Sequence, residues 1–289
     1  MTVILKRVQK KKHNPLVQPF LKWAGGKRQL LKDIRRWIPK NIGTYYEPFL
    51  GGGALLFDLQ PSKAIVNDSN SQLIEVYEVI RDDVNELIEE LRQHKNNSEH
   101  YYEVRELDRK SNFSELSKVR KAARIIYLNK TCYNGLFRVN SQGQFNVPFG
   151  KYRNPEIVNE IVLRAVNKYL NEADIRFTNL DFEEALEGIN KRSFVYLDPP
   201  YDPVSDTSSF TGYTLERFDK DEQARLKEVC DRLNDKGCKF ILSNSDTPFI
   251  RGLYKKYKFD VVYVGRAINS IASRRGKIAE VLVRNYEPE

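Results

Sequence analysis

The stretch SFVYLDPPY, residues 193–201, decides how this chain is expected to fold. Within it, three apolar residues and a tyrosine, at 194–197, predict a buried strand. The strand must end at Asp198, because the prolines that follow remove a backbone donor and restrict the residue before them. A carboxylate, proline carbonyls and the ring of Tyr201 would then stand at the carboxyl end of a strand, where open α/β sheets bind ligands. An ordinary strand-ending turn fits the same residues, since Asp and Pro are common in turns.

Two further strand ends, upstream of this one, predict a nucleotide-like cofactor. A strand ends near residues 48–49, glycines at 51–53 follow, and an apolar helix comes next. Glycine lets the backbone approach a ligand closely. Strand 64–67 ends at Asp68, at an offset from the glycines where a carboxylate can accept hydrogen bonds from ribose hydroxyls. The glycines do not match G-x-G-x-x-G, so the pattern favours an adenosine-containing cofactor without indicating a dinucleotide.

A second glycine pair, Gly25 and Gly26, precedes residues 29–38, whose apolar spacing predicts a helix. Free N–H groups at a helix start suit an anion or a carboxylate. Lys27 gains nothing from the helix dipole at this position, which favours a ligand-facing role, although a surface lysine fits as well. The earlier glycine that a P-loop requires is absent.

Strands and helices alternate along the chain except between residues 70 and 158. There the spacing predicts helices over 71–93, 101–108 and 116–129. The later segment predicts strands at 175–177, 239–242, 261–264 and 279–283, with helices at 183–186 and 220–233. We therefore expect an α/β fold in which residues 1–69 and 159–289 form one domain and residues 70–158 form a helical insertion.

Composition favours an anionic partner. The 289 residues carry a net charge of +9, which points first to nucleic acid, then to nucleotides or a membrane surface. Cys132, Cys230 and Cys238 form no C-x-x-C pair, so we expect neither a metal site nor a disulfide framework, and a reducing cytosol fits. No apolar run approaches the length of a membrane span. The basic N-terminus lacks the apolar segment of a secretory signal and fits a solvated tail better than a DNA-contacting arm.

Part of the positive charge falls in the insertion and in a late loop. Residues 131–152 predict a hairpin or loop pair in which Arg, Asn and Tyr are interleaved. Arg can bind guanine bidentately, Asn can read adenine, and aromatic rings can stack between bases, although a solvated loop fits equally. Ser273, Arg274 and Arg275 lie in a basic loop that favours phosphate contact over a plain connection.

The Asp-Pro-Pro-Tyr group suits one kind of chemistry. An exocyclic amine on a base is a poor nucleophile, because its lone pair is delocalised into the ring. Asp198 and the carbonyl of Pro199 could hold its two N–H groups and stabilise the charge that develops during attack, while Tyr201 stacks on the ring. A base in a duplex must be flipped out to reach such a pocket. The three histidines lie outside these motifs, so histidine base catalysis is unsupported.

The chain resembles the Dam-like DNA adenine-N6 methyltransferases, including the methylases of GATC-specific restriction–modification systems. The resemblance covers nearly everything after about residue 18. Its motifs are KWAGGK at 22–27, EPFLGGG at 47–53, Asn67-Asp68, YNGL at 133–136 with Arg138, NVPFG at 146–150, and DPPY at 198–201. It implies a Rossmann-like class I methyltransferase sheet with an inserted helical DNA-recognition domain.

The resemblance also implies roles for individual residues. It implies S-adenosylmethionine as methyl donor, no metal, and catalysis by Asp198, Pro199, Pro200 and Tyr201. The residues expected at the cofactor are Trp23, Lys27, Glu47, Pro48, Phe49, Gly51, Gly53, Asp68, Asp181, Phe182 and Asp198. Those expected at DNA are Lys22, Tyr133, Asn134, Leu136, Arg138, Asn146, Pro148, Lys151 and Tyr152, together with the basic loop. Arg138 would contact a guanine, Leu136 and Pro148 would make apolar base contacts, and Tyr133 would wedge into the duplex. Several relatives carry Arg where this chain has Lys151, so a bidentate contact would be lost there.

We therefore expect a cytoplasmic bacterial enzyme, a monomer or weak dimer, that methylates adenine N6 in double-stranded 5'-GATC-3' and protects DNA from a cognate restriction endonuclease. Two alternatives remain open. One is a methyltransferase that acts on RNA or on a protein glutamine amide. The other is a DNA-binding regulator that retains a cofactor pocket.

Overall fold

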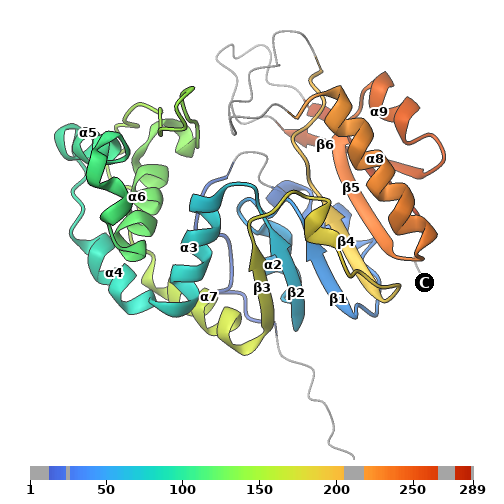
Figure 1. Ribbon diagram of the computed structural model, residues 1–289, viewed down its shortest axis with the longest axis horizontal. Coiled ribbons are helices and arrows are strands. Elements are labelled where there is room, and N and C mark those ends of the chain that lie inside the picture. The colour runs from blue at the N-terminus through green and yellow to red at the C-terminus, as the bar shows by residue number, and fades with distance from the viewer. Residues whose placement is uncertain (1–12, 24–26, 205–217, 266–276, 288–289) are drawn as a thin grey trace, which may run out of the picture.

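The computed structural model describes residues 13–23, 27–204, 218–265 and 277–287. These residues form a seven-stranded sheet with the order β3-β2-β1-β4-β5-β7-β6 (Figure 1). The strands are β1 (Thr44–Glu47), β2 (Lys63–Asn67), β3 (Asp174–Thr178), β4 (Ser193–Leu197), β5 (Lys239–Ser245), β6 (Lys258–Gly265) and β7 (Lys277–Arg284). Neighbouring strands from β3 to β5 are parallel, and β7 runs antiparallel to β5 and β6. The predicted α/β class is confirmed.

The strand β4 occupies the centre of the sheet and is buried on both faces. Phe194 and Tyr196 join one apolar cluster, whereas Val195 and Leu197 join the other. A strand covered on both sides reads as a continuous apolar run, which is the pattern that predicted it. The parallel neighbours β1, β2 and β5 end at the same edge as β4, so the residues that follow these strands are brought together.

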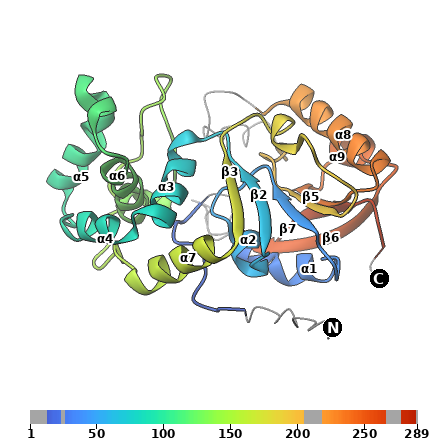
Figure 2. The same cartoon turned by 60° about the horizontal axis from the view of Figure 1, so that its bottom comes forward.

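Helices cover both faces of the sheet (Figures 1 and 2). One cluster packs α8 (Lys220–Asp235), α9 (Pro248–Leu253) and the 3-10 turn η5 (Glu184–Leu186) on one face. On the other face lie α1 (Leu31–Arg35), α2 (Ala54–Leu59) and α7 (Glu160–Glu172). The sequence reasoning did not find α7 or α9.

The segment between β2 and β3 is helical. It contains α3 (Ser71–Asp82), α4 (Val84–Arg92), α5 (Ser98–Arg105) and α6 (Lys118–Thr131), with the 3-10 turns η2 (Glu106–Arg109), η3 (Ser111–Glu115) and η4 (Tyr133–Gly135). In both views α4, α5 and α6 lie beyond the β3 edge, at the opposite end of the molecule from α8 and α9. Their buried residues belong to the same cluster as one face of the sheet. The insertion is therefore continuous with the core of the sheet.

Two predicted helices have the wrong extent. The helix expected over 71–93 is broken at Asp83, whose φ of −131° and ψ of 38° are not helical. The buried residues of α3 and α4 belong to the same core cluster, and Asp at the break is a weak helix former. The helix expected over 29–38 is only the five residues of α1, preceded by the 3-10 turn η1 (Lys27–Gln29).

None of the helices within the described ranges is both long and apolar enough to cross a membrane. The predicted phosphate-contacting residues Ser273, Arg274 and Arg275 lie outside the described residues.

Candidate active site

Asp198 directly follows β4 and binds two partners through one oxygen. Lys27 Nζ lies 3.0 Å from Asp198 Oδ1, and the Ser243 hydroxyl donates to the same oxygen at 2.8 Å. Lys27 comes from η1, and Ser243 comes from β5. Three elements distant in sequence thus meet at the carboxyl edge of the sheet. The Asp198 side chain keeps 19% of its surface exposed, so the carboxylate remains within reach of a ligand.

Opposing effects act on the Asp198 carboxyl. Burial raises its pKa above the ordinary value, while Lys27 and the Ser243 hydroxyl act to lower it. The net pKa is raised. The lysine and the serine thus limit the cost of keeping a charge in this place, and they favour the form that accepts hydrogen bonds.

Tyr201 stands beside the same lysine. Lys27 Nζ lies over the Tyr201 ring, 4.1 Å from its centroid, which is a cation–π distance. The Tyr201 hydroxyl donates to Glu280 Oε2 on β7 at 2.9 Å. Burial, with Asp198 and Glu280 nearby, raises the pKa of Tyr201 well above its usual value. The hydroxyl is therefore a neutral donor, and it fixes the ring in the site.

A buried polar network fixes the turn formed by the two prolines. Gln223 Nε2 on α8 donates to the Pro200 carbonyl at 2.8 Å, and Asn244 Nδ2 donates to Gln223 Oε1 at 3.1 Å. Asn244 Oδ1 accepts from the backbone N–H of Asp202 at 3.0 Å, and the Thr247 hydroxyl donates to Asp202 Oδ2 at 2.6 Å. Because α8 and β5 both hold the turn, its geometry is set by the sheet and its covering helix.

The glycine-rich turn after β1 is folded around Asp68. The N–H of Gly51 donates to Asp68 Oδ2 at 2.8 Å, and the N–H of Asn70 donates to Oδ1 at 2.9 Å. Burial raises the pKa of the Asp68 carboxyl, although both hydrogen bonds oppose this effect. Gly51 and Gly53 have φ values of 49° and 64°, which only glycine adopts readily. Asp68 therefore fixes the turn as well as standing at the tip of β2.

Glu47 is buried at the end of β1. It exposes 2% of its surface and accepts a hydrogen bond from the Tyr45 hydroxyl at 2.8 Å. Burial raises the pKa of Glu47 well above its usual value, despite the Tyr45 hydrogen bond, with Asp198 and Asp68 adding to the rise. Asn67 Nδ2 donates to the neighbouring Pro48 carbonyl at 3.1 Å.

Aromatic rings line the adjoining part of this edge. The rings of Phe49 and Phe182 lie 5.4 Å apart, and the Arg225 guanidinium lies 4.1 Å from the centroid of Phe182. Arg225 binds the Asp181 carboxylate through both terminal nitrogens, at 2.8 and 2.7 Å, and this pairing is the main reason that the pKa of Asp181 is lowered. Three predicted residues, Phe49, Asp181 and Phe182, are thus brought together with Arg225 of α8, which was not predicted.

The segment after α6 folds back as two short paired pieces. Isolated bridges join Cys132 to Phe149 and Val139 to Phe145. Arg138 donates to the Asn146 carbonyl through Nε at 3.0 Å and Nη2 at 2.7 Å. The predicted DNA-contacting residues that this segment exposes are Tyr133, Arg138, Asn146, Pro148 and Lys151. We call residues 131–152 the hairpin segment.

One ring stack connects the hairpin segment to the glycine turn. Trp23 stacks on Phe137 with centroids 5.0 Å apart, and a Cβ atom at Gly51 would lie 2.9 Å from Trp23 Cδ1. The side chain of Asn129 binds the backbone of Lys22 at 2.9 and 2.7 Å and also donates to the Gly135 carbonyl at 3.0 Å. The segment around Trp23 therefore touches both predicted functional regions.

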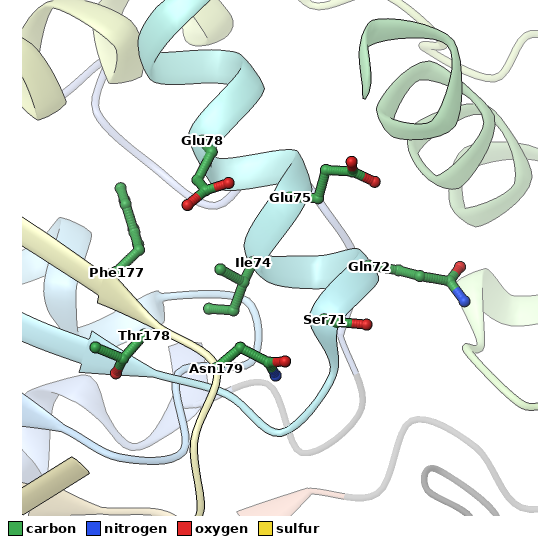
Figure 3. Close-up of a pocket in the computed structure, with 8 residues that line it drawn as sticks. All are labelled: Ser71, Gln72, Ile74, Glu75, Glu78, Phe177, Thr178 and Asn179. Carbon is green, nitrogen blue, oxygen red and sulfur yellow. The ribbon is translucent and has the colours of Figure 1, made fainter. Parts of the chain in front are cut away.

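A surface pocket of about 340 Å³ lies between α3 and the end of β3 (Figure 3). Ser71, Ile74, Phe177 and Asn179 are among its lining residues. None of the predicted site residues lines it, so it lies apart from the constellation around Asp198.

A family model described as "D12 class N6 adenine-specific DNA methyltransferase" matches residues 23–268. The chain is 44% identical over 281 residues to a Type II methyltransferase of Lactococcus lactis subsp. cremoris, covering 96% of this chain and 98% of the relative. A Type II methyltransferase of Methanocaldococcus jannaschii is 43% identical over 93% of this chain and 99% of its own length. The DNA adenine methylase of Escherichia coli (strain K12) is 36% identical, over 93% of this chain and 95% of the relative.

This chain belongs to the D12 class of N6 adenine-specific DNA methyltransferases. It is an adenine-specific DNA methyltransferase, and its mostly parallel sheet is the class I methyltransferase fold. Membership in this family implies S-adenosylmethionine as the methyl donor and DNA as the substrate. Across the described ranges, no cluster of three or more His, Cys, Asp or Glu side chains is arranged to bind a metal ion.

The side chains around the glycine turn of the methyltransferase are of the kinds that fit such a donor. A side chain at Gly51 would collide with Trp23, and a Cβ atom at Gly53 would lie 2.8 Å from the Tyr77 hydroxyl oxygen. Both positions are therefore restricted to glycine by the Trp23 and Tyr77 side chains that pack against the turn. Asp68 stands at the adjacent strand end, and the Phe49–Phe182 rings offer an apolar wall.

Several residues of the methyltransferase site were not predicted. Ser243, Glu280 and Gln223 contact the Asp-Pro-Pro-Tyr turn, and Asn244 binds Asp202 directly after it, yet none of the four belongs to the quoted motifs. A signal for two of them existed, because the polar run Ser243-Asn244-Ser245 directly follows the apolar core of β5. The strand was expected to end at residue 242, and its extension to Ser245 places these polar groups at the site.

Proposed function

We propose that this methyltransferase transfers a methyl group to adenine N6 in double-stranded 5'-GATC-3', on a base flipped out of the duplex. The observation that carries the proposal is the Asp198 carboxylate, held beside Tyr201 at the carboxyl edge of the sheet. The exposed hairpin segment, with Tyr133 and Arg138 on its surface, supports duplex DNA over a protein amide as the substrate.

The proposed catalytic groups act on the adenine amine. Asp198 and the Pro199 carbonyl accept its two N–H groups, which makes the nitrogen more pyramidal and stabilises the developing positive charge. Tyr201 stacks on the base. Because the Pro200 carbonyl is already bound by Gln223, the Pro199 carbonyl is the backbone acceptor assigned to the amine.

S-adenosylmethionine supplies an electrophilic methyl group when bound. The residues proposed to hold it are Trp23, Lys27, Glu47, Pro48, Phe49, Gly51, Gly53, Asp68, Asp181, Phe182 and Asp198. Asp68 has a further lone pair on each oxygen for a ribose hydroxyl, and the Phe49–Phe182 rings flank the adenine of the cofactor. Lys27 holds Asp198 from the cofactor side.

The hairpin segment is proposed to read the duplex. Arg138 uses Nε and Nη2 to hold the Asn146 carbonyl, which leaves the Nη1/Nη2 edge for guanine O6 and N7. Tyr133, of which 54% is exposed, wedges into the stack and offsets the cost of flipping, which is on the order of a few kcal/mol. Leu136 and Pro148 make apolar contacts with the bases. The remaining proposed contacts are Lys22, Asn134, Asn146, Lys151, Tyr152 and the basic loop with Ser273, Arg274 and Arg275.

Two of the curated relatives are Type II methyltransferases, which supports pairing with a restriction endonuclease of the same specificity. We propose that the enzyme protects cytosolic DNA in this way and acts as a monomer or a weak dimer.

Transfer of labelled methyl groups to matched duplexes tests the specificity. We expect incorporation into a GATC duplex and background incorporation into a duplex of the same composition with the site scrambled. Equal labelling of the two would contradict GATC specificity. Replacing the target adenine with 2-aminopurine measures flipping, because unstacking raises its fluorescence. An unchanged signal on binding would contradict the flipping step.

A further inference from the structure

A chain of two hydroxyl groups lies directly behind Asp198. The Tyr196 hydroxyl oxygen is 3.1 Å from Ser243 Oγ, and Ser243 Oγ is 2.8 Å from Asp198 Oδ1. Tyr196 and Ser243 expose 1% and 0% of their surfaces. Both hydroxyl groups are thus shielded from water. A hydrogen bond to a charged acceptor is stronger in such a buried environment than in water.

The strand register explains this arrangement. Tyr196 is paired with Ile241 and Leu197 with Leu242 in the β4–β5 ladder. One step further along, Asp198 leaves β4 and Ser243 continues β5, so the carboxylate and the hydroxyl emerge side by side. The prolines turn the chain away at this point and leave the Asp198 side chain facing the end of β5.

The hydrogen bonds of this chain run in one direction. An ionised carboxylate only accepts hydrogen bonds, so Ser243 must give its single hydroxyl hydrogen to Asp198. Ser243 can then only accept from Tyr196, whose hydroxyl becomes the donor. Burial raises the pKa of Tyr196 well above its usual value, and the nearby charge of Asp198 raises it further. This donor therefore stays protonated.

The two contacts that the described residues make with this carboxylate fall on the same oxygen. Lys27 Nζ and Ser243 Oγ both bind Oδ1, and they come from different sides, from η1 and from β5. Two donors at one oxygen restrict rotation of the carboxylate plane. The second oxygen, Oδ2, then keeps its lone pairs for a ligand.

We propose that Ser243, oriented by Tyr196, is a positioning residue that holds Asp198 Oδ1 so that Oδ2 accepts the N–H of the adenine amine. This inference rests on the proposed role of Asp198 and assigns that role to one oxygen. It also assigns the reaction a second layer of residues on β4 and β5 that the sequence motifs do not include.

The acid side of the pH profile reports on this contact. The charged and titratable groups facing Asp198 are Lys27 from η1, Glu47 from β1, Tyr196 and Tyr201 from β4 and its continuation, and Glu280 from β7 through Tyr201. Among these groups Lys27 lowers the pKa of Asp198, and the hydrogen bond from the Ser243 hydroxyl lowers it as well. Removing the serine hydroxyl therefore raises that pKa, and turnover should be lost at a higher pH on the acid side.

The decisive experiment is a double-mutant cycle with Ser243→Ala, Tyr196→Phe and the double variant, measured as the full chain on a GATC duplex and S-adenosylmethionine. We expect Ser243→Ala to lower kcat about tenfold to a hundredfold, because a hydrogen bond to a charged group is lost. Its KM for DNA and its calorimetric affinity for S-adenosylmethionine should change about twofold or less. Tyr196→Phe should lower kcat by a smaller factor, and should add almost nothing in the Ser243→Ala background, because Tyr196 acts through Ser243.

Two further variants separate positioning from general damage. Ser243→Thr keeps the hydroxyl and should restore most of the turnover and the wild-type acid limb. Ser193→Ala removes another buried serine at the opposite end of β4 and should leave kcat and the pH profile unchanged. Thermal unfolding identifies any variant that fails to fold. If the Ser243 variants do not fold, the test rests on Tyr196→Phe. A wild-type kcat in the folded Tyr196→Phe variant then overturns the proposal.

Asp198→Asn distinguishes failure of this inference from failure of the proposed function. If Asp198→Asn abolishes transfer while Ser243→Ala matches the wild type in kcat and pH profile, the positioning role is wrong and the role of Asp198 stands. If Asp198→Asn retains full turnover, both are wrong. Additive effects of Ser243→Ala and Tyr196→Phe would also overturn the chain of hydroxyl groups.

Discussion

Lys27 illustrates how much chemistry one side chain carries in this enzyme. Its position at a helix start predicted a ligand-facing role, because the helix dipole gives a cation nothing there. In the structure only 8% of the Lys27 side chain is exposed, and its ammonium is held between the Asp198 carboxylate and the Tyr201 ring. The sequence could indicate that this lysine is unusual, but its partners come from residues about 170 positions away.

Replacing Lys27 with Met should lower activity on the acid side of the pH profile. The pKa of Asp198 is already raised by burial, and Lys27 opposes that rise, so its removal raises the pKa further. Since the ionised carboxylate is the acceptor, activity should fall at higher pH than in the wild type as the solution is acidified. Lys27→Arg retains the charge and should keep the acid limb near its original place. The measurement is kcat against pH for the three proteins, and superimposable profiles would contradict the interpretation.

Arg138 is the residue whose change should alter specificity. Arg138→Ala removes the proposed guanine contact and should relax discrimination at one base pair by about 1–3 kcal/mol. Methylation rates on duplexes with single substitutions in GATC provide the measurement. Lys191→Ala, an exposed cation before the amino end of β4, is the control and should keep the wild-type preference. A preference unchanged by Arg138→Ala would remove this residue from the readout.

At the scale of secondary structure, the hairpin segment depends on a buried ion pair. Arg124 Nη2 on α6 lies 2.7 Å from Asp108 Oδ2, with side-chain exposures of 1% and 6%. The same oxygen accepts the N–H of Phe145 at 2.8 Å, and Arg109 donates to the Phe145 carbonyl at 3.0 Å. The backbone in the middle of the hairpin segment is thus bound by charged side chains of η2.

Asp108→Ala should strongly destabilise this region. It leaves the Arg124 guanidinium buried without its counter-charge, which costs about 3–5 kcal/mol of unfolding free energy in comparable cases. Asp82→Ala removes a partner of the more exposed Arg81 and should cost only about 0–1 kcal/mol. Denaturant unfolding of the two variants gives the comparison. Equal losses in the two variants would show that Asp108 does not have this structural role.

The elements predicted most accurately are those with a single dominant pattern. The strand β4 was placed to within one residue of its bounds, because a buried apolar run ended by Asp-Pro-Pro has few alternatives. The helix over 71–93 was too long, because the apolar spacing continues through Asp83 while the chain changes direction there. The short helix α9 was missed, since six residues give too little periodicity to recognise. Side-chain pairs such as Ser243 with Asp198 could not be predicted, because they depend on register between strands that are distant in sequence.

At the scale of the whole molecule, Trp23 couples the two proposed binding regions. It stacks on Phe137 of the hairpin segment and lies against the glycine turn that is proposed to hold the cofactor. The core cluster is also continuous from the insertion to the sheet. Binding at one region should therefore affect the other, and the effect must be reciprocal.

Phe137→Leu should weaken that coupling without removing either site. We expect the factor by which a GATC duplex tightens S-adenosylmethionine binding to fall severalfold, while cofactor affinity without DNA changes little. Titration calorimetry with and without duplex measures both quantities. Tyr102→Leu, a change to a partly exposed ring on α5, is the control. Coupling equal to that of the wild type in Phe137→Leu would show that the stack does not transmit it.

The position of β7 has a consequence for when the enzyme becomes active during protein synthesis. On the ribosome β6 is made before β7, yet in the finished sheet β6 pairs with β7 alone among the described strands. A nascent chain that ends before residue 277 therefore has every residue of the Asp-Pro-Pro-Tyr group but has no place for β6. It also lacks Glu280, which binds the Tyr201 hydroxyl. We therefore expect methylation to begin only with chains that are translated through β7.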